Sequence, residues 1–299
     1  MPQLGLGTWE SAQNEVREAV KTALRVGYRH FDCAAIYKNE REVGQGLKEG
    51  MAELGLKRSD IFVTSKLWNT SHRPDLVRTA CEQTLHDLDM DYVDLYLMHW
   101  PVDQIPAESP KVGGDPTATE TPLWETYDAM NELVSEGMVK AIGVSNFSVR
   151  ELEEIIKDTD LIPAVNQIEM HPYLIQQKLL DFCASKGITV TGYCPLGRTQ
   201  KPKAGDMPAL LENPVLKQIA EKRGKTTAQV AIRWQLQREV VVIPKSVNPS
   251  RIQQNFEVFD FVLDEADMAA LNGLNKSYRF VRPSFHDFAD DNIEGDGRL

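Results

Sequence analysis

The stretch Gly27-Tyr-Arg-His-Phe-Asp-Cys-Ala-Ala-Ile-Tyr-Lys-Asn-Glu-Arg-Glu-Val-Gly44 predicts a strand, a short loop and the start of a helix in one run. The strand ends near Asp32, the loop contains Tyr37, and the helix begins near Asn39. A carboxylate and a phenol therefore lie five residues apart at one strand-to-helix turn. A phenol, with an ordinary pKa of about 10, is a poor acid at neutral pH unless a nearby cation lowers that pKa.

A lysine and a histidine, either of which could act on such a phenol, stand at the ends of other predicted strands. Lys66 lies near the end of Phe62–Leu67, and His99 lies near the end of the apolar run Tyr92–Trp100. Taken alone, Tyr37 would be a half-buried core aromatic and His99 a structural histidine. Their shared position at strand ends makes both candidates for catalysis.

Composition excludes several classes of protein. The chain has 299 residues and a formal net charge of −11 at pH 7, which argues against nucleic acid or an anionic membrane as partner. The cysteines, which show no metal-ligand spacing, are Cys33, Cys81, Cys183 and Cys194. No basic-then-apolar start resembles a secretory signal, and no apolar run approaches the ~20 residues of a spanning helix. We expect a cytoplasmic protein with free thiols and no metal.

Eight predicted strands alternate with helices and indicate one fold class. The strands are expected at Leu4–Thr8, Arg29–Cys33, Phe62–Leu67, Tyr92–Trp100, Ala141–Ser145, Ala164–Met170, Ile188–Cys194 and Val240–Pro244. The helices are expected at Glu15–Arg25, Asn39–Leu54, Asp75–Leu88, Thr121–Glu136, Ser148–Asp158, Gln176–Lys186, Pro214–Lys222, Thr226–Arg238, Asn248–Phe256 and Asp264–Leu271. Alternation of this kind predicts parallel strands, and eight units favour a closed (β/α)₈ TIM barrel as a single domain over residues 1–299.

An open, doubly wound sheet is the alternative. It would require Gly-x-Gly-x-x-Gly at the first strand-to-helix turn, and Gly5-Leu-Gly-Thr-Trp-Glu10 lacks the third glycine. The glycines of Gly44–Gly50 lie inside a predicted helix, so we interpret them as packing residues. The barrel is the better prediction.

In such barrels the chemistry lies at the carboxyl ends of the strands. The residues found there are Asp32, Tyr37, Lys66, His99, Ser145, Asn146, Gln167, Tyr193, Lys245 and Ser246. Together with the segments Gly27–Gly44, Ile142–Phe147 and Ile243–Val247, followed by Arg251 and Asn255, they resemble the aldo-keto reductase family. The resemblance runs from Leu4 to about Leu274.

The chain departs from the family pattern at two places. Members usually begin with a β-hairpin that closes the barrel bottom, whereas this chain starts almost at its first strand, so we expect that hairpin to be absent. The loop after Tyr193 commonly carries serines over the cofactor pyrophosphate. Here Cys194 and Arg198 stand at such positions.

The resemblance implies reduction of aldehydes or ketones, including sugar-derived aldehydes, by hydride transfer from NADPH. Tyr37 would be the general acid. Lys66 would lower the pKa of Tyr37, Asp32 would hold Lys66 charged, and His99 would orient the carbonyl by a hydrogen bond. The substrate is left open among short aldoses, glyceraldehyde, uronates and keto esters.

The resemblance also implies where the cofactor binds. Tyr193 would stack on the nicotinamide, whose carboxamide Ser145, Asn146 and Gln167 would hold. Arg251 would contact the 2′-phosphate and favour NADP(H). The full expected set is Thr8, Trp9, Ser145, Asn146, Gln167, Tyr193, Leu196, Lys245, Ser246, Asn248, Arg251, Gln254 and Asn255.

Three tryptophans at strand ends, Trp9, Trp68 and Trp100, are expected to line an apolar substrate cleft. The segment Tyr278–Phe288, rich in phenylalanine, is expected to close that cleft, with a more mobile acidic end beyond it. We expect a monomeric enzyme. Other relatives of the family are lens crystallins and regulatory subunits of potassium channels. The presence of all four expected catalytic residues, Asp32, Tyr37, Lys66 and His99, argues against the crystallin alternative. No docking segment for a channel is evident.

Overall fold

The computed structural model describes residues 1–104, 121–197, 207–286 and 288. Its sheet has eight parallel strands in sequence order. The strands are β1 (Leu6–Gly7), β2 (His30–Asp32), β3 (Phe62–Leu67), β4 (Leu95–Met98), β5 (Ile142–Ser145), β6 (Val165–Glu169), β7 (Thr189–Tyr193) and β8 (Val241–Val242). Bonds from Gly5 N to Val242 O (2.8 Å) and from Gly7 N to Pro244 O (3.1 Å) join β8 to β1. The sheet is therefore closed, and the predicted barrel is confirmed.

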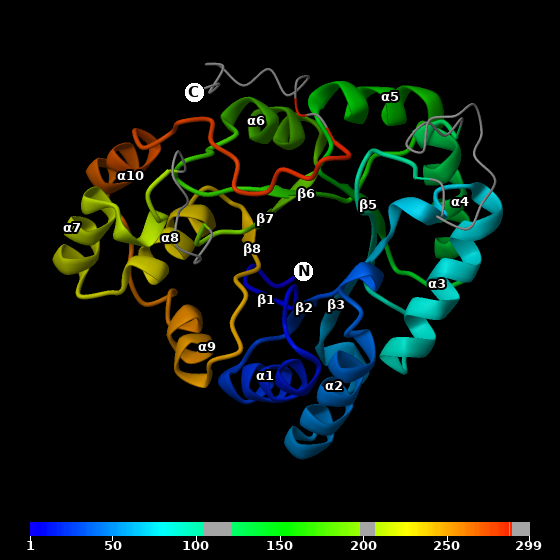
Figure 1. The fold of residues 1–299 in the computed structure, drawn as a ribbon, viewed down its shortest axis with the longest axis horizontal. Coiled ribbons are helices and arrows are strands. Elements are labelled where there is room, and N and C mark those ends of the chain that lie inside the picture. The colour runs from blue at the N-terminus through cyan, green and yellow to red at the C-terminus, as the bar shows by residue number, and fades with distance from the viewer. Residues whose placement is uncertain (105–120, 198–206, 287, 289–299) are drawn as a thin grey trace.

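Helices form a ring around the strands (Figure 1). They are α1 (Gln13–Val26), α2 (Glu40–Leu54), α3 (Pro74–Leu88), α4 (Leu123–Ser135), α5 (Val149–Thr159), α6 (Gln177–Lys186), α7 (Pro214–Arg223), α8 (Thr227–Leu236), α9 (Pro249–Phe256) and α10 (Glu265–Asn272). All ten correspond to predicted helices, with ends shifted by one or two residues. Among the described residues, no helix is long and apolar enough to cross a membrane, and no strand precedes β1.

Every strand except β3 is shorter than predicted, and β4 and β8 show the reasons. The expected strand Tyr92–Trp100 is reduced to Leu95–Met98, because the Asp94 carboxylate takes the backbone N–H of Val63 (2.9 Å) and His99 turns toward the barrel mouth. The expected strand Val240–Pro244 is reduced to Val241–Val242. At its start the Val240 N–H bonds to α8 (3.2 Å to Gln235 O), and Pro244 has no N–H to donate.

The side chains inside the barrel change from apolar to polar along its axis. Residues paired across neighbouring parallel strands share a face, and the register places Leu97 beside Lys66. Leu95, Leu97 and Val165 form a small apolar cluster of their own, separate from the large core that joins the helices to the barrel. Polar residues such as Lys66 and Gln167 follow toward the carboxyl ends of the strands. The apolar layer therefore supports a polar layer at the barrel mouth.

Glycines in α2 allow the first helices to pack closely. A side chain at Gly44 would overlap the backbone of Leu88 at the end of α3, and one at Gly50 would meet the side chain of Leu24 on α1. The interpretation of this glycine series as packing is confirmed. It fixes α2, and with it the turn that carries Tyr37.

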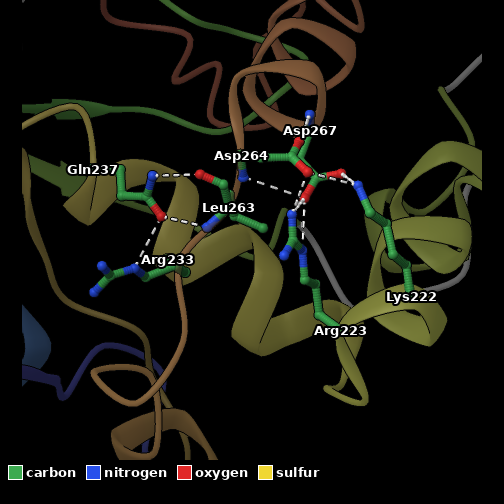
Figure 2. Close-up of polar contacts among 7 residues, drawn as sticks. All are labelled: Lys222, Arg223, Arg233, Gln237, Leu263, Asp264 and Asp267. Atoms are coloured by element: carbon green, nitrogen blue, oxygen red, sulfur yellow. Dashed lines mark hydrogen bonds and ion pairs between the residues drawn. The ribbon is translucent and has the colours of Figure 1, made fainter.

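Charged side chains fasten α10 to its neighbours (Figure 2). Asp267 accepts hydrogen bonds from Lys222 Nζ (2.8 Å) and Arg223 Nε (2.7 Å) on α7. Asp264 caps α10 by accepting the Asp267 N–H (2.8 Å) and also bonds to Lys222 (2.8 Å). Gln237, just after α8, accepts the backbone N–H of Leu263 (2.7 Å) and donates to the Leu263 carbonyl (2.9 Å). These contacts connect α7, α8 and α10 in one polar network.

The network lowers the pKa values of both carboxyl groups. Hydrogen bonding from Lys222 lowers the pKa of Asp264 to about 2. Burial opposes ionisation of Asp267, but the bonds from Lys222 and Arg223 outweigh it, so the pKa of Asp267 lies below its ordinary value of 3.8. Because folded pKa values below the unfolded one stabilise the fold above that value, the contribution is present above about pH 4 and is lost as the pH falls toward 2.

We predict that Asp267→Asn lowers the free energy of unfolding at neutral pH by about 1–3 kcal/mol, because it weakens hydrogen bonds between charged groups. It should also flatten the loss of stability in acid. Urea unfolding at neutral pH and near pH 3 measures both effects. The exposed pair Lys48–Asp89 gives the control, since Asp89→Asn should have a much smaller effect. Equal losses in the two variants would contradict the prediction.

Candidate active site

Lys66 is the centre of the polar layer at the barrel mouth. It is fully buried on β3, and its Nζ lies 2.8 Å from Asp32 Oδ2 at the end of β2. The same nitrogen lies 2.7 Å from the Cys33 carbonyl and 3.4 Å from Tyr37 Oη, on the short helical turn Ala35–Tyr37. A buried ammonium needs such partners, because burying an unpaired charge costs several kcal/mol. The predicted grouping of Asp32, Tyr37 and Lys66 is confirmed.

The net pKa of Tyr37 is raised rather than lowered, because other effects outweigh the predicted influence of Lys66. Loss of water around the phenol, followed by the negative charge of Asp32, raises the pKa of Tyr37 well above its ordinary value. Lys66 Nζ, 3.4 Å from Tyr37 Oη, opposes this shift only in part, because the same ammonium also pairs with Asp32 and the Cys33 carbonyl. Tyr37 is therefore firmly protonated, which is the form that a proton donor needs.

His99 faces Tyr37 across the site. The two rings lie 5.9 Å apart in an edge-on arrangement, and Trp68 lies 5.1 Å from the imidazole. Burial, followed by the charge of Lys66, lowers the pKa of His99 well below its ordinary value. The imidazole is therefore neutral and has one N–H to donate. His99 and Tyr37 together present two neutral donors to the space between them.

A set of amide and hydroxyl groups forms the opposite wall. Gln167 Nε2 donates to Asp32 Oδ1 (2.8 Å), so this amide secures the carboxylate that pairs with Lys66. Asn146 Nδ2 donates to the His99 carbonyl (2.9 Å) and to Ser145 Oγ (3.1 Å), while its Oδ1 accepts from Tyr193 Oη (2.7 Å). These contacts hold the side chains of the wall to one another.

A cavity of about 380 Å³ opens over these groups. The predicted residues that line it are Trp9, Asp32, Tyr37, Trp68, His99, Trp100, Ser145, Asn146, Gln167, Tyr193, Leu196 and Lys245. The predicted residues that do not line it are Thr8, Lys66, Ser246, Asn248, Arg251, Gln254 and Asn255. Thr8 is fully buried behind the site, where its hydroxyl donates to the Asp32 carbonyl (2.8 Å). Cys194 lines the cavity, and Arg198 lies outside the described residues.

The remaining predicted residues gather at the start of α9. Asn248 caps the helix by accepting the Arg251 N–H (3.1 Å), and Ser246 Oγ accepts the Asn248 N–H (3.1 Å). Arg251 and Gln254 are exposed, and Asn255 is buried. Lys245 connects this cluster to the cavity, since it lines the cavity and its Nζ donates to the Glu10 carbonyl (3.2 Å).

The C-terminal segment completes the cavity wall. Val281 and Phe285 line it, and the Phe285 ring lies 5.4 Å from Trp100 and 6.0 Å from Trp68. The expectation that this segment closes the tryptophan-lined cleft is confirmed for these two residues. The acidic end, residues 289–299, lies outside the described residues. Sequence reasoning missed Glu10, Ile36, Val281 and Phe285 as individual lining residues. The phenylalanine content of the tail was the only signal.

Glu40, the first residue of α2, was also missed. Its carboxylate is buried and accepts hydrogen bonds from Ser65 Oγ (2.6 Å) and Thr84 Oγ1 (3.4 Å). Burial raises the pKa of Glu40 to about 7. An acidic residue in the first turn is typical of any helix N-terminus, so the burial of Glu40 has no signal in the sequence.

We predict that Glu40 makes the protein less stable as the pH rises from about 5 to 8. The pKa of Glu40 in the folded chain is higher than its ordinary value of 4.5, so the carboxyl group favours folding below pH 4.5 and ceases to do so as the pH passes 7. Glu40→Gln should remove up to about 3 kcal/mol of this pH dependence, at about 1.4 kcal/mol per pKa unit. Urea unfolding of both proteins across this range is the measurement. Parallel pH profiles would refute the assignment.

Comparisons with known proteins agree with this geometry. The model of the aldo/keto reductase family matches residues 3–276. Aldo-keto reductase family 1 member A1 of Xenopus tropicalis is 49% identical over 290 residues, which cover 95% of this chain and 88% of that protein. The Homo sapiens protein of the same name is 47% identical over 288 residues, which cover 95% and 89%. The structure of the aldose reductase from Schistosoma japonicum matches with a TM-score of 0.85 and 46% identity, over 92% of this chain and 90% of that one.

Proposed function

Because this chain belongs to the aldo/keto reductase family, we propose that it reduces aldehydes and ketones to alcohols with NADPH, using Tyr37 as the proton donor. Family membership makes the chain an oxidoreductase of carbonyl compounds. The observation that carries the proposed roles is the Lys66 ammonium, which lies 2.8 Å from Asp32 and 3.4 Å from the Tyr37 hydroxyl beside the cavity. Sugar-derived aldehydes are included in the proposed substrate range.

The residues around the cavity fit a nicotinamide cofactor. Tyr193 offers an aromatic ring, and Ser145, Asn146 and Gln167 offer the donors and acceptors that a carboxamide requires. NADPH, when bound, supplies the hydride that is added to the carbonyl carbon. Every other part of the reaction falls to side chains of this chain.

Tyr37 and His99 act on the carbonyl oxygen. The neutral His99 donates a hydrogen bond that orients the carbonyl group, and Tyr37 passes its proton to the oxygen as negative charge develops there. The Tyr37 oxygen is left as a phenolate, which the nearby Lys66 stabilises. Asp32 holds Lys66 in place, and Gln167 holds Asp32. Burial raises the pKa of Tyr37, and the fixed positive charge of Lys66 offsets part of that cost as the proton leaves.

The start of α9 would bind the other end of the cofactor. Backbone N–H groups at a helix N-terminus favour anions, and Arg251 adds an exposed guanidinium there. Arg251 contacts the 2′-phosphate in this proposal, while Gln254 and Asn255 reach the adenine. Lys245 lies between the two ends of the site. We further propose that the enzyme is a cytoplasmic monomer that acts on small molecules, without nucleic acid or membrane partners.

We predict that Tyr37→Phe retains NADPH binding and lowers turnover by about 10²–10⁴-fold or more, because only the transferable proton is removed. The rate of NADPH consumption with an aldehyde and the quenching of tryptophan fluorescence by NADPH measure the two quantities. Tyr127→Phe is the control, since that hydroxyl lies 3.5 Å from the Ile142 carbonyl and away from the cavity. Turnover of Tyr37→Phe near that of the control would exclude Tyr37 as the acid.

We predict that Arg251→Ala weakens NADPH binding by about 1.5–3 kcal/mol, the usual contribution of a hydrogen bond to a charged group. NADH binding should hardly change, because NADH lacks the 2′-phosphate. Fluorescence titration of both cofactors measures the difference. Arg73→Ala, which removes an exposed arginine paired with Asp75, is the control. Equal losses for NADPH and NADH in Arg251→Ala would show that Arg251 does not read the phosphate.

A further inference from the structure

Glu169, the last residue of β6, is fully buried beside the segment that follows α10. Its Oε1 accepts the backbone N–H of Phe280 at 2.7 Å, and its Oε2 accepts the backbone N–H of Val281 at 3.1 Å. His171 Nε2 lies 2.9 Å from Oε1. One buried carboxylate therefore holds two consecutive backbone groups of a segment 111 residues away in the chain.

The same segment makes further contacts just before these bonds and at Phe280 itself. The Tyr173 carbonyl accepts the N–H groups of Lys276 and Tyr278, each at 3.1 Å. The Phe280 ring packs 4.8 Å from His171 and 6.4 Å from Tyr173. Figure 1 shows this red segment crossing from α10 over the ends of β7 and β6. The end of β6 and residues 276–281 thus form one packed unit.

This unit determines where the cavity wall lies. Val281 lines the cavity directly after the bond to Glu169, and Phe285 follows four residues later against Trp68 and Trp100. On its other side, the Phe280 ring packs against Gly197, where an added Cβ would come within 2.9 Å of the ring. Gly197 has φ of +66° and also lines the cavity.

We propose that Glu169 is a positioning residue that fixes Phe280 and Val281 and thereby sets Phe285 as a wall of the substrate site, which determines selectivity for aromatic carbonyl compounds. This proposal rests on the proposed function, because selectivity among carbonyl compounds presupposes that the enzyme reduces them. Glu169 itself does not line the cavity, so it acts through the backbone that it binds. A carboxylate suits this task because both of its oxygens only accept, whereas the amide of glutamine would place an N–H₂ group against a backbone N–H.

The experiment compares Glu169→Gln with the wild type in two readouts. The first is trypsin cleavage of the folded protein after Arg279, with the fragments identified by mass spectrometry. Releasing the backbone at Phe280 should speed this cleavage about tenfold. The second is the ratio of KM for benzaldehyde to KM for propanal with saturating NADPH. We expect the ratio to rise about tenfold, with kcat for propanal changed less than about twofold.

A double-mutant cycle tests whether Glu169 acts through Phe285. Phe285→Ala should raise the benzaldehyde KM by a similar factor without speeding cleavage after Arg279. Adding Glu169→Gln to Phe285→Ala should then raise that KM by less than about twofold more, because the wall that Glu169 positions is already gone. If the two effects multiply in full, the proposal is overturned. Should Glu169→Gln fail to fold, Glu169→Asp takes its place, since it retains the charge but is shorter by one methylene.

Asp267→Asn controls for general loss of stability, because Asp267 is a buried carboxylate that holds α10 rather than the cavity wall. This control should change neither the KM ratio nor the preference for cleavage after Arg279. If Glu169→Gln gives the wild-type KM ratio or the wild-type cleavage rate, the proposal is wrong. If the wild type reduces no aldehyde with NADPH, the proposed function fails. The cleavage rate then still tests whether Glu169 holds the segment, and a wild-type rate in the variant overturns that.

Discussion

The buried ion pair between Lys66 and Asp32 is the constraint on which the rest of the site depends. A charged pair inside a barrel is tolerated only where every partner is in place. The Cys33 carbonyl and the Gln167 amide complete this set. β2 and β3 must therefore pair in this register, and β6 must lie across the barrel at a level where Gln167 reaches Asp32. The pair itself is almost fully buried, and the apolar cluster of Leu95, Leu97 and Val165 lies deeper in the barrel. The contacts of Lys66 and Asp32 can therefore form only when the barrel is closed.

Exclusion of water also sets the protonation states at the mouth. It raises the pKa of Tyr37 and lowers that of His99, so both groups are neutral donors at rest. The positive charge of Lys66 is shared with Asp32, and its attraction to the Tyr37 oxygen strengthens as the phenol loses its proton. A site built in this way is selective for the transition state, because its strongest interaction appears only as charge develops.

Much of this could be predicted from the sequence, because local patterns carry it. Strand-to-helix alternation predicts the barrel, and residues at strand ends fall together once the barrel closes, as Asp32, Lys66 and His99 do. The features that could not be predicted depend on contacts between segments that are distant in the sequence. The pKa of Tyr37 follows from its burial and from the charge of Asp32, and Glu40 is buried against Ser65 and Thr84. Which tail residue meets Trp100 follows from the bonds that Glu169 makes. None of these has a local signature.

The Glu169 anchor has a consequence for how this protein can diverge. The carboxylate binds backbone N–H groups, which every residue except proline possesses, so these two bonds do not depend on the side chains at positions 280 and 281. Substitutions at Val281 or Phe285 can therefore reshape one wall of the cavity while the backbone that carries them stays in register. The polar layer around Lys66 belongs to the barrel strands and not to this segment. Chemistry and substrate choice are thus separable traits, each free to mutate without the other.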